Sequence, residues 1–338
     1  MTPLRPDADP ALAVRQLREW LGAREPAQLL IETSGSSGIP KRVLLSREAV
    51  LASAAASAGR LGAQGRWLLA LPSAYVAGVQ VIVRSLLAGH DPIVVGSTFA
   101  AAVEEADEPL FTSLVPTQLH RMLDDAAETA ALARLHTVLL GGGPIDPTLR
   151  ARAEEAGLRV VATYGASETA GGCVYDGFPL DGVAVALGTG GRIRLGGPTI
   201  FDGYEGDLAL TERTLVDGWY VTSDAGRLDD DGRLQVLGRL DDMVVSGGVN
   251  VPLPAVAARL RAHPDVAWVE VLGLDDPEWG QRVVAYVVGG LALGEARDWV
   301  AASHPRSWAP REVVRLEAMP LLENGKVDRV ALRRLSES

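Results

Sequence analysis

Thr33-Ser-Gly-Ser-Ser-Gly-Ile-Pro-Lys41 is the stretch on which the fold assignment depends, and two short apolar runs, residues 28–32 and 42–45, flank it. The runs predict two β-strands joined by this loop. Small loop residues let the backbone approach a polyphosphate, whose oxygens can accept from N–H groups and hydroxyls beside the charge of Lys41. The Walker P-loop differs, because its lysine directly precedes a helix. The alternative is a flexible surface hairpin. The predicted phosphate-binding residues are Thr33, Ser34, Gly35, Ser36, Ser37, Gly38 and Lys41.

Strand-like runs recur beyond this segment, with helical patterns between most of them. Their alternation predicts an α/β domain with a mainly parallel sheet. From residue 188 short strands and turns dominate, which predicts a β-rich subdomain, including a hairpin turn at residues 229–232. The runs cover residues 67–71, 92–95, 110–114, 137–140 and 158–162.

A second alternation follows residue 242 and predicts a small α+β domain. The predicted fold is therefore a large N-terminal α/β domain, residues 1–240, and a C-terminal domain, residues 241–338. In the second domain, helices are expected at residues 253–262, 293–303 and 331–335, and strands at residues 266–273, 282–288 and 312–316.

The overall charge argues against one class of partner. A net charge of −11 makes nucleic-acid binding unlikely, because a phosphate backbone needs concentrated Lys and Arg.

The one cysteine, Cys173, excludes an intrachain disulfide and fits a reducing cytoplasm. The N-terminus does not read as a signal peptide, and no apolar run reaches the length of a membrane span.

The distribution of lysine is informative. Of the 32 lysines and arginines, only two are lysines, Lys41 and Lys326. A chain that otherwise prefers arginine suggests a need for a compact ammonium on a flexible stem at these positions, although chance is the alternative. Asn324-Gly325 is a tight turn signal that would place Lys326 at the tip of a loop. A solvated turn lysine is the other interpretation.

Three further segments carry polar groups suited to a nucleotide. In residues 163–169, Tyr164 offers a ring for base stacking and Glu168 suits Mg²⁺, although a capped helix start would look similar. The glycines at 141–143 form a second close-approach loop or a plain turn. Asp224 can accept from ribose hydroxyls and Arg239 can reach ribose or phosphate, unless each is a turn or surface group.

Taken in order between residues 29 and 329, these motifs resemble the adenylate-forming superfamily of acyl-CoA synthetases, adenylation domains and luciferases. The resemblance implies that Gly142, Tyr164, Gly165 and Ser167 line the ATP site. It also implies that Glu168 helps hold Mg²⁺, and that Asp224 and Arg239 bind ribose. Asp241 would be the hinge to a mobile C-terminal domain, and Lys326 would bridge the acid and the α-phosphate.

The chemistry that the resemblance implies has two steps. A carboxylate attacks the α-phosphorus of ATP, pyrophosphate leaves, and the C-terminal domain then rotates so that coenzyme A can accept the acyl group. Residues 246–251 and 275–281 look like the CoA-ligase versions of these segments, with Gly247 and Gly248 beside CoA. Relatives in this superfamily suggest a homodimer.

Residues 71–84 resemble the o-succinylbenzoate-CoA ligases of menaquinone biosynthesis, whose acid carries a second carboxylate on a benzene ring. Arg84, one helical turn after Gln80, would be the cation for that group, directly or through water. The alternative is that Gln80 and Arg84 form the wet face of a helix. Another aryl or short-chain acid, or a non-catalytic nucleotide-binding homologue, is also open. The predicted lining of the acyl cleft is Tyr75, Arg84, Ser113, Thr117 and Gly141.

Some positions depart from the pattern of this superfamily. Tyr75 stands where many relatives have histidine, so an aromatic gate there would work without an imidazole. Arg42 replaces a usual glycine and Val249 a common glutamate. The last two weaken inferences about loop geometry and CoA contacts.

Overall fold

The computed structural model describes residues 2–33, 40–96, 98–103, 108–322 and 325–336. Its largest sheet has seven strands in the order β4-β3-β5-β6-β7-β8-β9. The pairs from β4 to β7 are parallel, and β8 and β9 are antiparallel additions. The predicted α/β domain with a mainly parallel sheet is confirmed. The strands are β3 (Arg66–Leu69), β4 (Ile93–Val94), β5 (Leu110–Leu114), β6 (Thr137–Leu140), β7 (Val160–Ala166), β8 (Gly171–Tyr175) and β9 (Phe178–Pro179).

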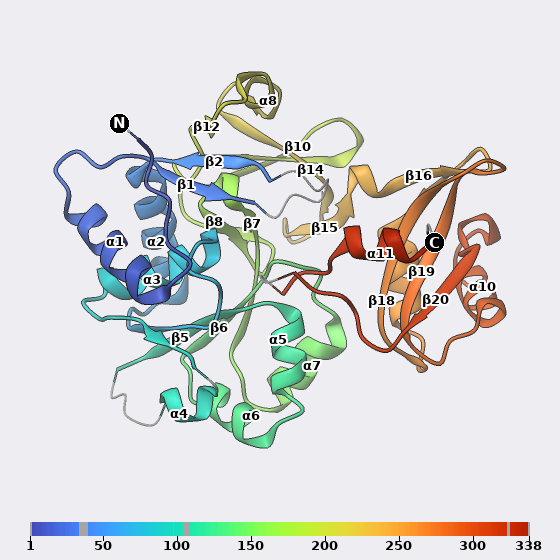
Figure 1. Ribbon diagram of the computed structural model, residues 1–338, viewed down its shortest axis with the longest axis horizontal. Helices are drawn as coiled ribbons and strands as arrows, with labels where there is room; N and C mark the ends of the chain where they lie inside the picture. The colour runs from blue at the N-terminus through green and yellow to red at the C-terminus, as the bar shows by residue number, and fades with distance from the viewer. Residues whose placement is uncertain (1, 34–39, 97, 104–107, 323–324, 337–338) are drawn as a thin grey trace.

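Helices cover both faces of this sheet, because successive side chains of a strand point to opposite faces. Leu139 of β6 packs with α1–α3 in one core, whereas its neighbours Val138 and Leu140 pack with α4–α7 in a second core. Figure 1 shows the two groups of helices on either side of the strands. The helices are α1 (Pro10–Gly22), α2 (Arg47–Leu61), α3 (Val76–Leu87), α4 (Phe99–Val103), α5 (Pro116–Met122), α6 (Ala126–Ala133) and α7 (Pro147–Glu155).

The predicted strands around residues 33–41 are present. β1 (Leu29–Glu32) pairs antiparallel with β2 (Arg42–Leu45), and β12 (Gly203–Tyr204) adds to β2. Thr33 donates its N–H to the carbonyl oxygen of Lys41 at 2.9 Å, which closes the base of the loop. The Ser46 side chain accepts from the Ala49 N–H and caps α2.

A five-stranded β-rich part follows the large sheet along the chain. The predicted hairpin joins β14 to β15, with Gly232 at φ +78° in its turn. Short 3₁₀ helices, η1 (Ser167–Thr169) and η2 (Thr189–Gly191), lie before these strands. The remaining elements are β10 (Ala184–Leu187), β11 (Arg192–Gly196), α8 (Leu208–Thr214), β13 (Leu215–Val216), β14 (Trp219–Leu228) and β15 (Leu234–Arg239).

The last part of the chain has its own sheet, in the order β17-β16-β19-β18 with β20 parallel to β19. Separate apolar clusters fill its two faces. Figure 1 shows it beside the large sheet, with the α11 end turned toward that sheet. Its elements are η3 (Leu240–Asp242), β16 (Met243–Ser246), β17 (Val249–Pro252), α9 (Leu253–Arg261), β18 (Val266–Asp276), β19 (Gly280–Gly289), α10 (Leu293–Ala301), η4 (Arg306–Trp308), β20 (Glu312–Leu316) and α11 (Arg329–Ser336).

Several strand boundaries differ from the sequence prediction. β7 continues through Ala166, because β8 pairs antiparallel with its second half. Tyr164 therefore lies within the strand, and the 3₁₀ turn η1 follows instead of a helix start. β18 and β19 are longer than predicted, because Asp276 accepts from the N–H groups of Glu278 and Trp279 and tightens the turn between them. Among the described residues, no helix has the length and apolar character that a membrane crossing requires.

Candidate active site

The carboxyl ends of β5, β6 and β7 meet at one edge of the large sheet, which is where α/β folds gather ligand-binding groups. Gly141 directly follows β6 and donates its N–H to the Leu114 oxygen at 3.1 Å. A Cβ at Gly141 would lie 2.3 Å from Thr163 Oγ1, so a larger residue would displace β7. Gly142 has a φ of +79°. The glycine loop therefore brings bare backbone to the end of the sheet.

The loop that carries Lys326 projects from the C-terminal sheet to this edge. A bridge between Leu321 and Val327 closes the loop, and Gly325 turns it at φ +76°. Thr117 Oγ1 donates to the Gly325 oxygen at 3.2 Å. Lys326 Cε is 3.6 Å from where a Cβ would sit on Gly142. The structure thus joins Lys326 to Thr117 and Gly142, three residues that the sequence placed in one site.

Lys326 is exposed to solvent while its side chain passes beside Gly142. Neighbouring protein atoms nevertheless displace part of its water, and this desolvation lowers the pKa of Lys326 below its ordinary value of 10.5. The Glu168 carboxylate acts in the opposite direction, and the Arg239 guanidinium lowers the pKa further. Glu168 and Arg239 are therefore both close enough to Lys326 to change its pKa.

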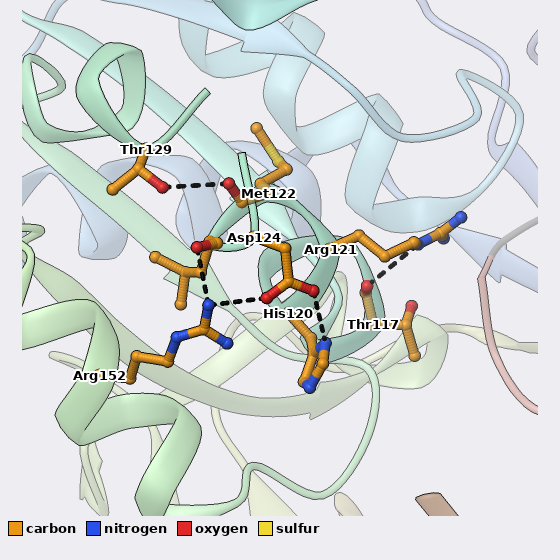
Figure 2. Close-up of polar contacts among 8 residues, drawn as sticks. Thr117, His120, Arg121, Met122, Asp124, Thr129 and Arg152 are labelled. Atoms are coloured by element: carbon orange, nitrogen blue, oxygen red, sulfur yellow. Dashed lines mark hydrogen bonds and ion pairs between the residues drawn. The ribbon is translucent and has the colours of Figure 1, made fainter. Parts of the chain in front are cut away.

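Helix α5 holds Thr117 in position through a network at its other end. Arg152 of α7 donates to Asp124 Oδ1 and to the Leu123 oxygen, each at 2.7 Å. Thr129 of α6 donates to the Met122 oxygen at 3.1 Å, and Figure 2 shows these contacts around the end of the helix. The hydrogen bond from Arg152 lowers the pKa of Asp124. The helix that presents Thr117 is therefore fastened to its two neighbours.

Glu168 is 5% exposed and stands in η1 at the end of β7. Tyr204 donates its hydroxyl proton to Glu168 Oε1 at 2.8 Å, and the Lys41 ammonium lies 5.5 Å from the centroid of the Tyr204 ring. The structure thus connects Glu168 to the lysine of the loop at residues 33–41. Tyr204 was not predicted, because its link to Glu168 depends on the pairing of β12 with β2.

The predicted adenine and ribose residues contact each other. Tyr164 donates its hydroxyl proton to Asp224 Oδ2 at 2.7 Å. Burial, followed by the Asp224 charge, raises the pKa of Tyr164 well above its ordinary value, so the hydroxyl stays protonated. Asp224 and Arg239 are register partners on β14 and β15. These pairings therefore bring together an aromatic ring, a carboxylate and a guanidinium.

The residues present suit a magnesium ion that is shared with phosphates. Among the described residues, no group of three or more His, Cys, Asp or Glu side chains could cage a metal alone. Mg²⁺ at nucleotide sites takes one or two carboxylates and completes its shell with water and phosphate oxygens. Glu168 supplies such a carboxylate, with Lys41 nearby for the phosphate charge.

Gln80 and Arg84 are buried in α3, with 2% and 8% of their surfaces exposed. The alternative that they form a wet helix face is therefore wrong. Arg84 stacks over the Trp67 ring at 5.1 Å from its centroid, and its Nη2 donates to the Tyr175 hydroxyl at 3.3 Å. Gln80 Nε2 donates to the Ala170 oxygen at 2.9 Å. Burial in α3 brings both side chains against β3 and β8.

The other predicted residues occupy varied places. Tyr75 stands at the N-cap of α3, and Ser113 is buried in β5. Gly165 and Ser167 flank the end of β7. Gly247 and Gly248 form the β16–β17 turn, which packs on Trp279. Residues 34–39 lie outside the described residues, so the roles predicted for Ser34, Gly35, Ser36, Ser37 and Gly38 stay predictions.

Two family models match the chain. The model for AMP-binding enzymes covers residues 7–206, and the model for the C-terminal domain of AMP-binding enzymes covers residues 255–326. A probable 2-succinylbenzoate–CoA ligase from Mycobacterium tuberculosis H37Rv is 42% identical over 97% of this chain and 91% of the relative. A 2-succinylbenzoate–CoA ligase from Bacillus cereus ATCC 10987 is 32% identical over 93% and 71%.

Solved structures are also similar. The Bacillus subtilis o-succinylbenzoate CoA synthetase MenE, in complex with the acyl-adenylate OSB-AMP, is 27% identical with a TM-score of 0.78 over 90% of this chain and 68% of that one. ATP-bound MatB from Rhodopseudomonas palustris is 22% identical with a TM-score of 0.82 over 92% and 68%, which shows the shared fold. The family models and the close relatives together establish that this chain belongs to the AMP-binding enzyme family.

Proposed function

We propose that the protein is an o-succinylbenzoate-CoA ligase, which activates its acid through an acyl-adenylate and transfers it to coenzyme A. The observation that carries this proposal is Arg84, a buried arginine. Among the described residues, no carboxylate forms an ion pair with Arg84, and its Nε has no hydrogen-bond partner. A buried charge costs several kcal/mol unless an anion compensates it. An acid with a second carboxylate would supply that anion.

Packing contacts link Arg84 to the end of β6 through Tyr175, Gly172 and Thr163. A Cβ at Gly172 would lie 3.1 Å from Thr163 Cβ and 3.2 Å from Tyr175 Cε1. Thr163 in turn borders Gly141, at the end of β6. Gln80 Oε1 is a second buried atom without a partner among the described residues. We place the succinyl carboxylate near Gly141 and Lys326, and the aromatic carboxylate toward Arg84.

The first reaction step depends on charge at the α-phosphate. The substrate carboxylate attacks the α-phosphorus, and pyrophosphate leaves on the opposite side. Lys326, protonated, would contact both the acid and the α-phosphate and stabilise the charge of the pentacoordinate transition state. Tyr164 would stack on adenine, and Asp224 would accept from the ribose hydroxyls. Mg²⁺ held by Glu168 would neutralise phosphate charge.

Transfer to coenzyme A requires a second arrangement of the same chain. We place the domain boundary at residues 240 and 241, with Asp241 in η3 as the hinge. Rotation there would withdraw Lys326 from Gly142 and present the turn of Gly247 and Gly248 to the thiol. Both glycines have positive φ, +59° and +76°, so the turn offers bare backbone. ATP and CoA as substrates suit a cytoplasmic enzyme, and we expect a homodimer.

The test is CoA-ester formation with ATP, Mg²⁺ and a panel of acids: o-succinylbenzoate, benzoate, a short fatty acid and an amino acid. We expect a strong preference for o-succinylbenzoate. Turnover of a different acid would retain the adenylation chemistry and reject the proposed substrate. The absence of acid-dependent pyrophosphate exchange would reject catalysis altogether. Arg84→Met should lose the preference for o-succinylbenzoate while it keeps pyrophosphate exchange with a monocarboxylate.

A further inference from the structure

We infer that Tyr175 and Ser57 are positioning residues for Arg84, and that they set the selectivity of the enzyme for an acid with a second carboxylate. The inference rests on the proposed function. Its basis is a hydrogen-bonded chain that joins β8, α2 and α3. All three side chains are buried, and Tyr175 is among the largest fully buried side chains in the described part of the protein.

The direction of the first hydrogen bond in this chain follows from the donors available. Arg84 has only N–H donors, so Tyr175 accepts from Nη2 at 3.3 Å. The Tyr175 and Ser57 oxygens are 2.9 Å apart. Either hydroxyl can donate in this second hydrogen bond. The chain therefore links Arg84 to Tyr175 and Tyr175 to Ser57.

This chain restricts the guanidinium on two sides. The Trp67 ring covers one face, and Tyr175 holds Nη2. Nε remains without a hydrogen-bond partner among the described residues. A planar guanidinium binds a carboxylate best when two parallel N–H groups have a fixed orientation. Without the Tyr175 hydroxyl, Arg84 would stay buried but could turn about its long side chain.

Tyr175 also packs near the carboxyl end of the large sheet, through Gly172 and Thr163. Its ring edge and the Thr163 side chain both lie close to Gly172, 3.2 and 3.1 Å from where a Cβ would sit on that glycine. Tyr175 and Thr163 are register partners on β8 and β7. Tyr175 therefore lies opposite Thr163, the β7 residue that borders Gly141 at the carboxyl end of β6.

The experiment compares two acids in Tyr175→Phe. One is o-succinylbenzoate and the other is 4-oxo-4-phenylbutanoate, which lacks only the ring carboxylate. A hydrogen bond to a charged group corresponds to roughly tenfold or more in an equilibrium constant. We expect KM for o-succinylbenzoate to rise about tenfold, with kcat little changed and with unchanged kinetics for 4-oxo-4-phenylbutanoate. Ser57→Ala should change the selectivity in the same direction by a smaller factor.

Tyr286→Phe is the matched control. Tyr286 is also fully buried, and its hydroxyl lies 2.7 Å from Ser336 Oγ, but it belongs to the C-terminal sheet. It should keep the selectivity of the wild type. Thermal unfolding of the Tyr175, Ser57 and Tyr286 variants would separate loss of stability from loss of selectivity.

Three outcomes would count against the inference. If the wild type prefers o-succinylbenzoate and Tyr175→Phe keeps that preference, the positioning role is wrong and the proposed function survives. If both acids lose activity in parallel, Tyr175 has only a structural role. If the wild type shows no preference for the acid with the ring carboxylate, the proposed function and this inference are both rejected. Should Tyr175→Phe fail to fold, Ser57→Ala alone decides between the first two outcomes.

Discussion

Arg329 binds Asp242, the residue next to the proposed hinge. Its Nη1 donates to the two Asp242 oxygens at 2.8 and 3.0 Å, and its Nε donates to Glu270 Oε1 at 2.6 Å. Arg329 begins α11, directly after the loop of Lys326. The ion pair therefore links that loop to the start of the C-terminal sheet. Rotation at the hinge would move them as one body.

Arg329→Gln should slow adenylation about tenfold, because Lys326 would no longer keep one position relative to the hinge. KM for ATP should change little. The measurement is pyrophosphate exchange, with CoA transfer from a supplied acyl-adenylate measured in parallel. Arg282→Gln is the control, since Arg282 also lies between two carboxylates. The exposure of the two side chains is similar, 26% for Arg282 and 29% for Arg329. Equal losses of adenylation rate in the two variants would contradict the proposed link between the Lys326 loop and the hinge.

Lys326→Ala should reduce adenylation by on the order of a hundredfold or more, because the transition state loses a charged donor. Transfer of a supplied acyl-adenylate to CoA should persist. The first measurement is acid-dependent pyrophosphate exchange. Survival of exchange in the variant would reject the role of Lys326.

The desolvation of Lys326 predicts an alkaline limit to adenylation below pH 10.5, because the lowered pKa deprotonates the ammonium earlier than in a free lysine. Lys326→Arg should remove that limit if it keeps any activity. The same shift affects stability. Between the lowered pKa and 10.5, the unfolded chain binds more protons, so this group makes the free energy of unfolding rise with pH. A pH series of denaturant titrations on the wild type and Lys326→Met would measure it.

The two tyrosines beside acidic residues predict different phenotypes. Tyr164→Phe removes the hydrogen bond to Asp224 but keeps the ring, so KM for ATP should rise by a factor of about ten at most. Tyr204→Phe removes the bond to Glu168, so the Mg²⁺ concentration for half-maximal rate should rise instead. Titrations of ATP and Mg²⁺ on both variants would test this. The same phenotype in both would contradict the separate roles.

Gly325→Ala should impair adenylation through a steric clash as well as through backbone strain. A Cβ there would lie 2.9 Å from Val115 Cγ2, at a φ of +76°. Gly206 has the same φ, but nothing lies within 4 Å of its Cβ position. Both alanine variants should lose about 1 kcal/mol of stability. Only Gly325→Ala should slow adenylation, and an equal effect of Gly206→Ala would contradict the steric argument.

Cys173 is fully buried, and burial raises the pKa of its thiol to about 12. Thiol reagents at neutral pH should therefore modify it only after the protein opens. The labelling rate in increasing denaturant should follow unfolding measured by circular dichroism. Rapid labelling under native conditions would show that β8 opens locally.

Much of the fold could be predicted from the sequence, because it depends on short-range patterns. Runs of buried aliphatic residues specified the strands, and Ser46 specified the start of α2. Strand pairing was harder to predict from the sequence. β7 extends to Ala166 because β8 turns back along it, and no pattern within residues 158–166 reveals that partner.

The sequence by itself determined which residues we propose for the chemistry. The segment at residues 33–41, Glu168, Asp224 and Lys326 were recognisable from residue type and order, because each group needs particular atoms for phosphate, metal or ribose. The tertiary structure decided what holds these groups. Tyr204 meets Glu168 across 36 residues, and Tyr175 meets Arg84 across 91. Such contacts depend on how whole strands and helices pack, so only the folded chain turns Arg84 into a buried cation without a carboxylate partner among the described residues.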